Sequence, residues 1–493
     1  MVFNSYTFIA FFIVLLILHN LPFSWKVKKL NLLLASYIFY AAWNPPFIIL
    51  LWLSTMVDYI VGRALYHQEN KVKRKGLLFL SLAANLGMLG FFKYGAFLLE
   101  NFTTLANAVG IDFQAAKPDI ILPVGISFYT FQTLSYTLDM YRRKAPPEKS
   151  LLDFSLFVTF FPQLVAGPIV RPAELLPQFK TPHVTDSKKL VQGLMLLTMG
   201  LFMKVVLADS MLSASADAVF GARGPVHTLD AWTGVLAFSG QIFFDFAGYS
   251  TCAIGIALCL GFRLPDNFLY PYAAIGFSDF WRRWHITLSS WLRDYLYIPL
   301  GGNRNGKTRT YINLMLTMLI GGLWHGASWT FVVWGGLHGA YLWGEKMIQD
   351  HSKKKQVPMK SVPSAEIGVL GVLPKDLKAK TFRNFMYAMV TFFFINVTWV
   401  FFRAPDFGSA WQLLNAMFYN VPKAEALLTT LNIIKVLTIT FFMVAFHWIM
   451  RDTKVLVIGE KMPWWLLGIV WAVLILLLVW SQESGSSFIY FQF

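Results

Sequence analysis

The chain has 493 residues, of which 56% are hydrophobic and 14% are charged, and its mean hydropathy is +0.53. A typical soluble domain has about 25% charged residues, so this composition excludes an ordinary soluble protein and predicts a polytopic membrane protein. The net charge of +16 does not indicate nucleic-acid binding, because Lys and Arg gather in short loops between apolar stretches, as positive-inside topology predicts.

The N-terminal part of the chain predicts five membrane-spanning helices. The first, at residues 6–18, follows no basic segment and precedes no small-residue cleavage site, so we expect a retained span and no signal peptide. Basic loops at 26–29, 71–75 and 142–144 follow the first, third and fifth spans. Because positive loops stay in the cytoplasm, the N-terminus is expected to be extracytoplasmic.

Later apolar stretches predict seven further crossings. Two of them form a hairpin around His325, and the C-terminus returns to the outside. The other five are expected at residues 190–207, 232–260, 385–402, 431–450 and 464–480.

Two long segments fit no span, namely 151–182 and 265–309, because they mix aromatic residues with Pro, Gly and charge. Irregular backbone survives at membrane depth only where protein encloses it or where it lines a cavity. We therefore expect these two segments to form the walls of a site.

His325 is the strongest functional candidate, because it lies between apolar stretches in the run Trp324-His325-Gly326-Ala327-Ser328. About 35 apolar residues are available for a hairpin that would need roughly 40 to cross twice, so we expect it to be short or broken. A structural histidine, hydrogen-bonded within a helix turn, is the alternative. An ionisable side chain at membrane depth favours function, and a neutral imidazole can take a proton from a hydroxyl and later return it.

The run from Ser278 to Asn303 is the second candidate, because it places arginines and His285 among tryptophans and tyrosines. The near-helical spacing of its tryptophans, Trp284 among them, predicts one short helix at the cytoplasmic interface. Its arginines suit either Asp–Arg pairs in an interfacial anchor or the phosphates of a nucleotide-bearing thioester. We take Arg282, Arg283, Arg293 and Asn303 as candidate donor-binding residues.

Three further runs carry polar groups in apolar surroundings, where packing is the alternative to function. They contribute Ser127 and Tyr129, Gln163, and Asp245, and Asp245 is expected to orient a histidine or to pair with an arginine.

Other catalytic apparatus is not evident in the sequence. It has no Gly-x-Ser-x-Gly elbow, phosphate-binding loop or zinc helix. Cys252 and Cys259 suggest neither a disulfide framework nor a metal site, and His285 with His325 lacks a third metal ligand. We therefore expect no metal.

As an ordered set, these runs resemble the membrane-bound O-acyltransferase family, in its bacterial branch that O-acetylates exported polysaccharides such as alginate. The resemblance covers nearly the whole chain and includes the ending Phe488 to Phe493. It implies an all-α ring of about 11–12 tilted transmembrane helices, with re-entrant and interfacial helices around a central funnel. The whole chain would form one domain, with N-terminal helices at about 5–145, a catalytic core at 150–345, a cytoplasmic loop at 346–383 and C-terminal helices at 384–493.

The resemblance also implies an activity and its setting. The enzyme would pass an acetyl group from cytoplasmic acetyl-CoA, a substrate and not a bound cofactor, to an extracytoplasmic SGNH-type serine acetyltransferase or directly to a polysaccharide. His325 matches the essential histidine of the family, and His285 matches a second polar position. Trp324, Ser328 and amides near Gly326 would stabilise the oxyanion. The implied setting is the bacterial cytoplasmic membrane, with the lipid bilayer and polysaccharide export machinery as partners and no nucleic acid.

Other acyl transfers remain open, namely of D-alanine, or of acyl groups to peptidoglycan, cellulose or a lipid. A transporter or flippase is the alternative outside this enzyme class, since transporters also hold ionisable residues near the membrane midplane.

Overall fold

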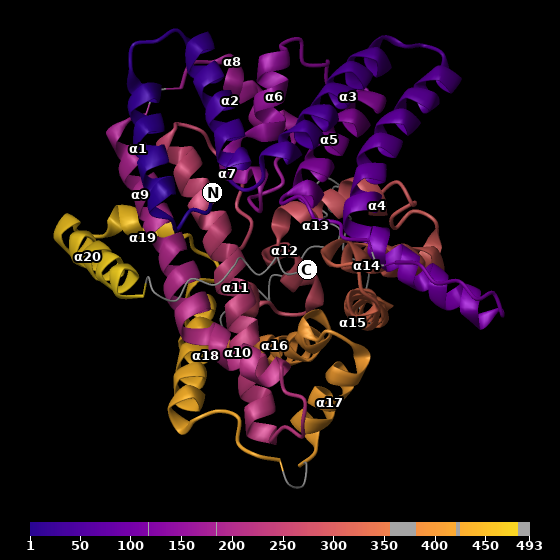
Figure 1. Ribbon diagram of the computed structural model, residues 1–493. Helices are drawn as coiled ribbons and strands as arrows, with labels where there is room; N and C mark the ends of the chain where they lie inside the picture. Colours follow the sequence, from indigo (N-terminus) through magenta and orange to yellow (C-terminus); the bar gives the residue numbers. More distant parts are fainter. Residues whose placement is uncertain (117, 184, 355–380, 421–423, 482–493) are drawn as a thin grey trace. The chain divides into compact units, whose positions relative to one another are not determined.

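The computed structural model describes residues 1–116, 118–183, 185–354, 381–420 and 424–481. Within these residues the chain is helical, with one isolated bridge between Val226 and Glu425, so the predicted all-α class is confirmed (Figure 1). The chain forms two compact units, Met1–Gly200 with Tyr249–Pro265 and Leu201–Gly248 with Asp266–Phe493. The prediction of a single domain stays a prediction.

Six helical segments in the described ranges are long and apolar enough to cross a membrane, and α1 (Tyr6–Asn20) and α20 (Trp464–Trp480) are shorter apolar helices. The predicted spans at 232–260, 385–402, 431–450 and 464–480 are found within a few residues of their expected bounds. The span expected at 190–207 is longer than predicted, because the helical segment runs from Ser187 to Phe220. The total of 11–12 crossings stays a prediction. The six segments are Pro45–His67, Lys71–Ala108, Ser187–Phe220, Thr228–Cys259, Phe382–Arg403 and Thr430–Met450.

The first unit contains α1, α2 (Trp25–Ala41), α3 (Ile48–His67, after the short η1 at Pro45–Phe47), α4 (Lys71–Ala108), α5 (Ile126–Tyr141) and nearly all of α9 (Ser187–Leu201). Helices α3, α4 and α5 pack against one another around Asp58, which is fully buried (Figure 1). Its carboxylate accepts hydrogen bonds from Ser81, Asn85 and Thr137.

The segment 151–182 is broken into three short helices, as expected: α6 (Leu151–Thr159), α7 (Phe161–Leu164) and α8 (Pro172–Lys180). Phe160 leaves the helical conformation between α6 and α7, and Gly167 lies so close to Gln163 that a Cβ on Gly167 would stand 2.4 Å from the Gln163 Cα. Only glycine fits this turn.

The second unit contains the π-helical η2 (Phe202–Ser213), α10 (Ala214–Phe220) and most of α11 (Thr228–Cys259). Its later elements are the short η3 (Pro271–Ala273), α12 (Phe277–Arg283), α13 (Ile286–Leu292), η4 (Arg293–Tyr297), α14 (Gly306–His325), α15 (Trp329–Lys354), α16 (Phe382–Arg403), α17 (Phe407–Phe418), α18 (Thr430–Met450), α19 (Val455–Lys461) and α20.

Helices α14 and α15 form the predicted hairpin around His325. They have 20 and 26 residues, so the hairpin is not as short as predicted, and its hydropathy and charge, not its length, keep both helices from the candidate spans. Two glycines let the helices touch: a Cβ on Gly322 would lie 2.3 Å from the Phe331 carbonyl oxygen, and one on Gly335 would lie 2.3 Å from that of Met318. This close packing fixes the position of His325 at the end of α14.

The prediction of one interfacial helix across the tryptophans at 281, 284 and 291 is wrong, because the chain breaks between α12 and α13. His285 adopts a left-handed conformation with φ of 43° at the break. The Asn267 side chain accepts hydrogen bonds from the Thr287 amide at 3.3 Å and hydroxyl at 2.9 Å, and the Asn267 carbonyl accepts one from the Ile286 amide at 2.9 Å. These bonds hold the start of α13 in place of a continuous helix.

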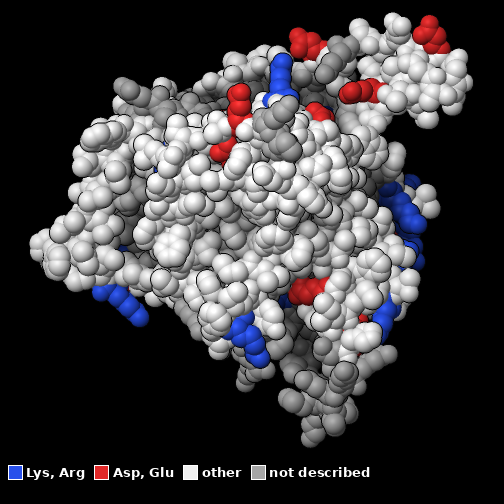
Figure 2. Space-filling view, turned by 90° about the horizontal axis from the view of Figure 1, so that it is seen from below, with Lys and Arg blue, Asp and Glu red and all other residues white. Residues whose placement is uncertain are grey.

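Uncharged residues cover most of the face seen in Figure 2. This agrees with a protein whose surface contacts lipid. Most of the predicted cytoplasmic loop at 346–383 lies outside the described residues. The ending Phe488 to Phe493 lies wholly outside them.

Candidate active site

The structure brings His285 and His325 together around Trp324 in the second unit. The Trp324 ring lies 5.0 Å from the His325 ring and 6.0 Å from the His285 ring, centroid to centroid. Both histidines are buried, with 3% of His325 and 0% of His285 exposed. Two residues forty positions apart in the sequence thus lie in one aromatic cluster.

His285 is held in one tautomer by Asn267. The bond from Thr287 identifies the Asn267 atom nearest to His285 as the amide oxygen, Oδ1, which can only accept hydrogen bonds. The His285 Nδ1 atom, 3.1 Å away, therefore carries a hydrogen and donates a hydrogen bond to this oxygen. The Nε2 atom therefore carries the lone pair. Burial lowers the pKa of His285 to about 3, so the ring is neutral at pH 7.

Aromatic rings enclose His325. Trp334 lies 5.1 Å and Phe402 5.4 Å from its ring. We did not predict Asn267, Trp334 or Phe402 as site residues, because a loop asparagine and helical aromatics carry no sequence signal that distinguishes them from packing residues.

The turn after His325 is tightly packed. A Cβ on Gly326 would lie 2.1 Å from the Phe331 ring, so any larger residue at this position would have to displace that ring. The Ser328 hydroxyl lies 3.1 Å from the Thr330 hydroxyl and accepts from the Thr330 amide at 3.3 Å. Ser328 therefore holds the start of α15, and its predicted oxyanion role stays a prediction.

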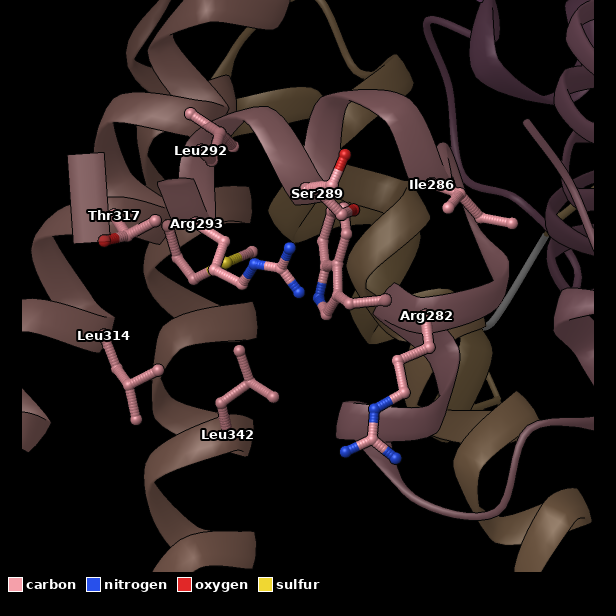
Figure 3. A pocket seen from close by; sticks show the side chains of 11 residues that line it. Arg282, Ile286, Ser289, Leu292, Arg293, Leu314, Thr317 and Leu342 are labelled. Carbon is pink, nitrogen blue, oxygen red and sulfur yellow. The ribbon is translucent and has the colours of Figure 1, made fainter. Parts of the chain in front are cut away.

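A cavity of about 180 Å³ opens between α12, α13, η4, α14 and α15 (Figure 3). Arg282 and Arg293 approach it from different elements, and Ser289 and Ser290 add hydroxyls. Apart from Thr317, its remaining lining is apolar and aromatic: Trp281, Ile286, Leu292, Leu314, Met318 and Leu342. Arg293 Nε donates to Asp294 Oδ1 at 2.6 Å, so part of its charge is already compensated. Together with Arg282, it still makes the apolar cavity suit a ligand that combines an anionic group with a nonpolar chain.

The other two candidate donor-binding residues do not line this cavity. Arg283 Nε donates to Asp279 Oδ1 at 2.9 Å, and Arg283 Nη1 donates to the Arg451 carbonyl at 2.8 Å. Arg451 in turn donates to Asp279 Oδ2 at 2.6 Å, so Arg283 belongs to a buried ionic network. Asn303 accepts a hydrogen bond from the Tyr297 hydroxyl.

Asp245 pairs with a lysine that the sequence did not single out. Lys204 Nζ lies 2.7 Å from Asp245 Oδ1 and 2.8 Å from Asp209 Oδ1. The three side chains are at most 10% exposed and form a buried ionic triad, which we call the Lys204 triad.

The remaining predicted residues divide between the units. Trp284 is fully buried in the aromatic core of the second unit, with its ring 5.1 Å from Trp399. Ser127, Tyr129 and Gln163 belong to the first unit, where Gln163 donates to the Phe157 carbonyl at 3.0 Å. Their place beside His325 stays a prediction.

Comparison with known proteins places this geometry in a family. Residues 11–362 match the membrane-bound O-acyltransferase family. The chain is 37% identical to the probable alginate O-acetylase AlgI of Pseudomonas putida over the full length of both proteins. It is 40% identical to the corresponding protein of Pseudomonas aeruginosa, over 85% of this chain and 75% of the relative. A peptidoglycan O-acetyltransferase of Helicobacter pylori is 39% identical, over 79% of this chain and 73% of the relative.

The match covers the hairpin with His325, the break with His285 and the residues around the cavity. The chain therefore belongs to the membrane-bound O-acyltransferase family and is an O-acyltransferase.

Proposed function

We propose that this enzyme moves an acetyl group from cytoplasmic acetyl-CoA to a hydroxyl group on the other side of the membrane, with His325 as the general base. The acceptor is the serine of an extracytoplasmic SGNH-type acetyltransferase, or a sugar hydroxyl of an exported polysaccharide. The setting is the bacterial cytoplasmic membrane, with both termini outside.

The observation that carries the proposal is the position of the arginine-lined cavity relative to His325. Met318 lines the cavity and precedes His325 by seven residues on α14, which corresponds to about 10 Å along a helix. Arg282 and Arg293 suit the phosphates of a nucleotide-bearing thioester, and the apolar wall suits its chain. A donor held there by its phosphates would extend its acyl end toward His325.

The proposed chemistry needs no covalent intermediate on the protein. His325 takes the proton of the attacking hydroxyl while its oxygen forms a bond to the thioester carbonyl carbon. The carbon–sulfur bond then breaks, the ester leaves with the acetyl group, and the thiolate receives the proton from His325. Trp324, Ser328 and amides near Gly326 would stabilise the oxyanion between the two steps.

The relatives guide the choice of acceptor. Proteins named for alginate acetylation match most of the chain, which supports an alginate-like exported polysaccharide. The relative named as a peptidoglycan O-acetyltransferase, at similar identity, makes peptidoglycan the second candidate.

The test uses the purified protein in liposomes with radiolabelled acetyl-CoA and a candidate acceptor. His325→Ala should abolish acetyl transfer while acetyl-CoA binding persists. Arg282→Ala and Arg293→Ala should raise KM for acetyl-CoA with little change in kcat, because they hold a part of the donor that does not react. Arg304→Ala, at an exposed arginine outside the cavity lining, is the matched control. Full transfer by His325→Ala would refute the general-base role, and absence of acetyl-CoA binding by the native protein would refute the donor.

A further inference from the structure

Helix α12 carries Arg282 to the cavity, although it has only seven residues and lacks a local cap. Its N-cap residue is Gly276, with φ of 86°, which has no side chain to accept a hydrogen bond from the first turn. The first amides of a helix have no acceptor within the helix and need one from elsewhere. Because so short a helix is not stable by itself, the position of Arg282 depends on contacts from other elements of the second unit.

Glu345 of α15 supplies the missing acceptor. Its Oε2 atom accepts a hydrogen bond from the Ser278 amide at 2.8 Å, and its Oε1 atom accepts one from Gln349 Nε2 at 3.1 Å. Gly276 lets the carboxylate approach, because a Cβ at this position would lie 2.9 Å from Glu345 Oε1. The start of α12 is thus bonded to α15 through one side chain whose two oxygens are both engaged.

Arg282 is attracted by acidic residues but keeps a donor for a ligand. Asp279 and Glu345 are the acidic residues whose charge acts on Arg282. The Asp279 oxygens accept from Arg283 and from Arg451. The Arg282 Nη2 atom is buried and has no acceptor in the part of the chain that the structure describes. Arg282 therefore reaches the cavity with an unused N–H group (Figure 3).

We propose that Glu345 is a positioning residue of the donor site, which fixes the start of α12 through the Ser278 amide and so directs Arg282 to the cavity. The inference rests on the proposed function, since it takes Arg282 as a contact to the donor phosphates. Glu345 is not among the described residues that line the cavity. It acts on the donor only through Arg282.

The spacing along both helices makes this coupling direct. Ser278 and Arg282 are four residues apart on α12, so they share one face of the helix. On α15, Glu345 follows Leu342 by three residues, and Leu342 lines the cavity with Arg282 (Figure 3). A shift in the start of α12 would move the Arg282 guanidinium relative to Arg293. A donor that contacts both arginines would then bind less tightly.

The experiment measures kcat and KM for acetyl-CoA with the full-length protein in liposomes. Glu345→Ala should raise KM about tenfold with little change in kcat, because it releases a binding group and leaves the reacting atoms untouched. Partial misfolding would have the opposite signature, since fewer active molecules lower the apparent kcat and leave KM unchanged. The two constants therefore distinguish positioning from loss of the fold.

Two further variants test the route through Arg282. Glu345→Gln keeps an oxygen for the Ser278 amide, so its KM should stay within about threefold of the native value. The double variant of Glu345→Ala with Arg282→Ala should have no higher KM than Arg282→Ala alone, because both changes remove the same contact. Asp350→Ala is the matched control, since this acidic residue of α15 pairs with Lys346 at 3.1 Å; its KM should be native.

Each outcome decides a different point. A native KM in Glu345→Ala, or KM increases that multiply in the double variant, would overturn the positioning role. A Glu345→Gln variant with a KM as high as that of Glu345→Ala would overturn the hydrogen bond to Ser278 as its cause. Failure of the native enzyme to bind acetyl-CoA would instead overturn the proposed donor, and the role of Glu345 with it.

Discussion

Replacing Lys204 by methionine should destabilise the second unit strongly. Lys204 Nζ lies 2.8 Å from Asp209 and 2.7 Å from Asp245, and each carboxylate is 2% exposed. Lys204→Met fills a similar volume but removes the ammonium that both carboxylates share. Because removal of one partner leaves buried charge uncompensated, we expect a loss of about 3–5 kcal/mol in the free energy of unfolding.

The neighbouring variants give the expected order of stability. Asp209→Asn and Asp245→Asn each keep one ion pair, so each should cost less than Lys204→Met. The triple variant, which combines Lys204→Met with both aspartate-to-asparagine substitutions, has no charge left in the triad. It should recover most of the stability, since a neutral, well-packed replacement of a buried ionic group is often tolerated.

The assay is denaturant unfolding of the detergent-solubilised protein, followed by tryptophan fluorescence, with all variants compared in one detergent. Lys204→Met with native stability would refute the electrostatic argument. A triple variant no more stable than Lys204→Met would show that packing, and not uncompensated charge, caused the loss.

Three further predictions concern other positions. Gly326→Ala should lower acetyl transfer about 100-fold with the fold preserved, because the new Cβ would displace the Phe331 ring beside the His325 turn; native activity would contradict it. Asp58→Ala should lower the free energy of unfolding by about 3 kcal/mol, because three buried donors lose their acceptor, and Asp58→Asn should cost less; denaturant unfolding of both variants checks this order. Burial lowers the pKa of His285 from 6.5 to about 3, so between these values the unfolded chain binds a proton that the folded protein does not. The free energy of unfolding should therefore fall as the pH drops below 6.5, by up to about 1.4 kcal/mol per pH unit. His285→Gln should reduce the difference in the free energy of unfolding between pH 7 and pH 5. An unchanged difference would contradict this prediction.

The sequence alone was sufficient for the class of protein and for most helices, and it made His325 the leading candidate for the base. Apolar runs such as 464–480 specify a helix at almost the observed residues, because helix length and hydropathy are local properties. Proline, glycine and charge marked 151–182 and 265–309 as broken segments for the same reason. The Trp-His-Gly run made its histidine a candidate, because an ionisable group among apolar residues is costly.

Tertiary structure decided which way the polar side chains face. Arg282 and Arg283 are adjacent in the sequence, yet Arg282 lines the cavity and Arg283 bonds to Asp279 and to Arg451. The four-residue spacing of Asp279 and Arg283 on α12 favours their ion pair locally. The Arg451 carbonyl, which also accepts from Arg283, lies 168 residues away, and no local pattern predicts it.

The same holds for the Lys204 triad and for His285. Lys204 and Asp209 are five residues apart, which an α-helix would turn to different faces, but the π-helical geometry of η2 aligns residues at this spacing. The tautomer of His285 depends on Asn267, which lies 18 residues earlier in the chain. Hydropathy and periodicity determine where the helices form, whereas the direction and protonation of a buried polar group depend on partners that only the packed helices bring within hydrogen-bonding distance.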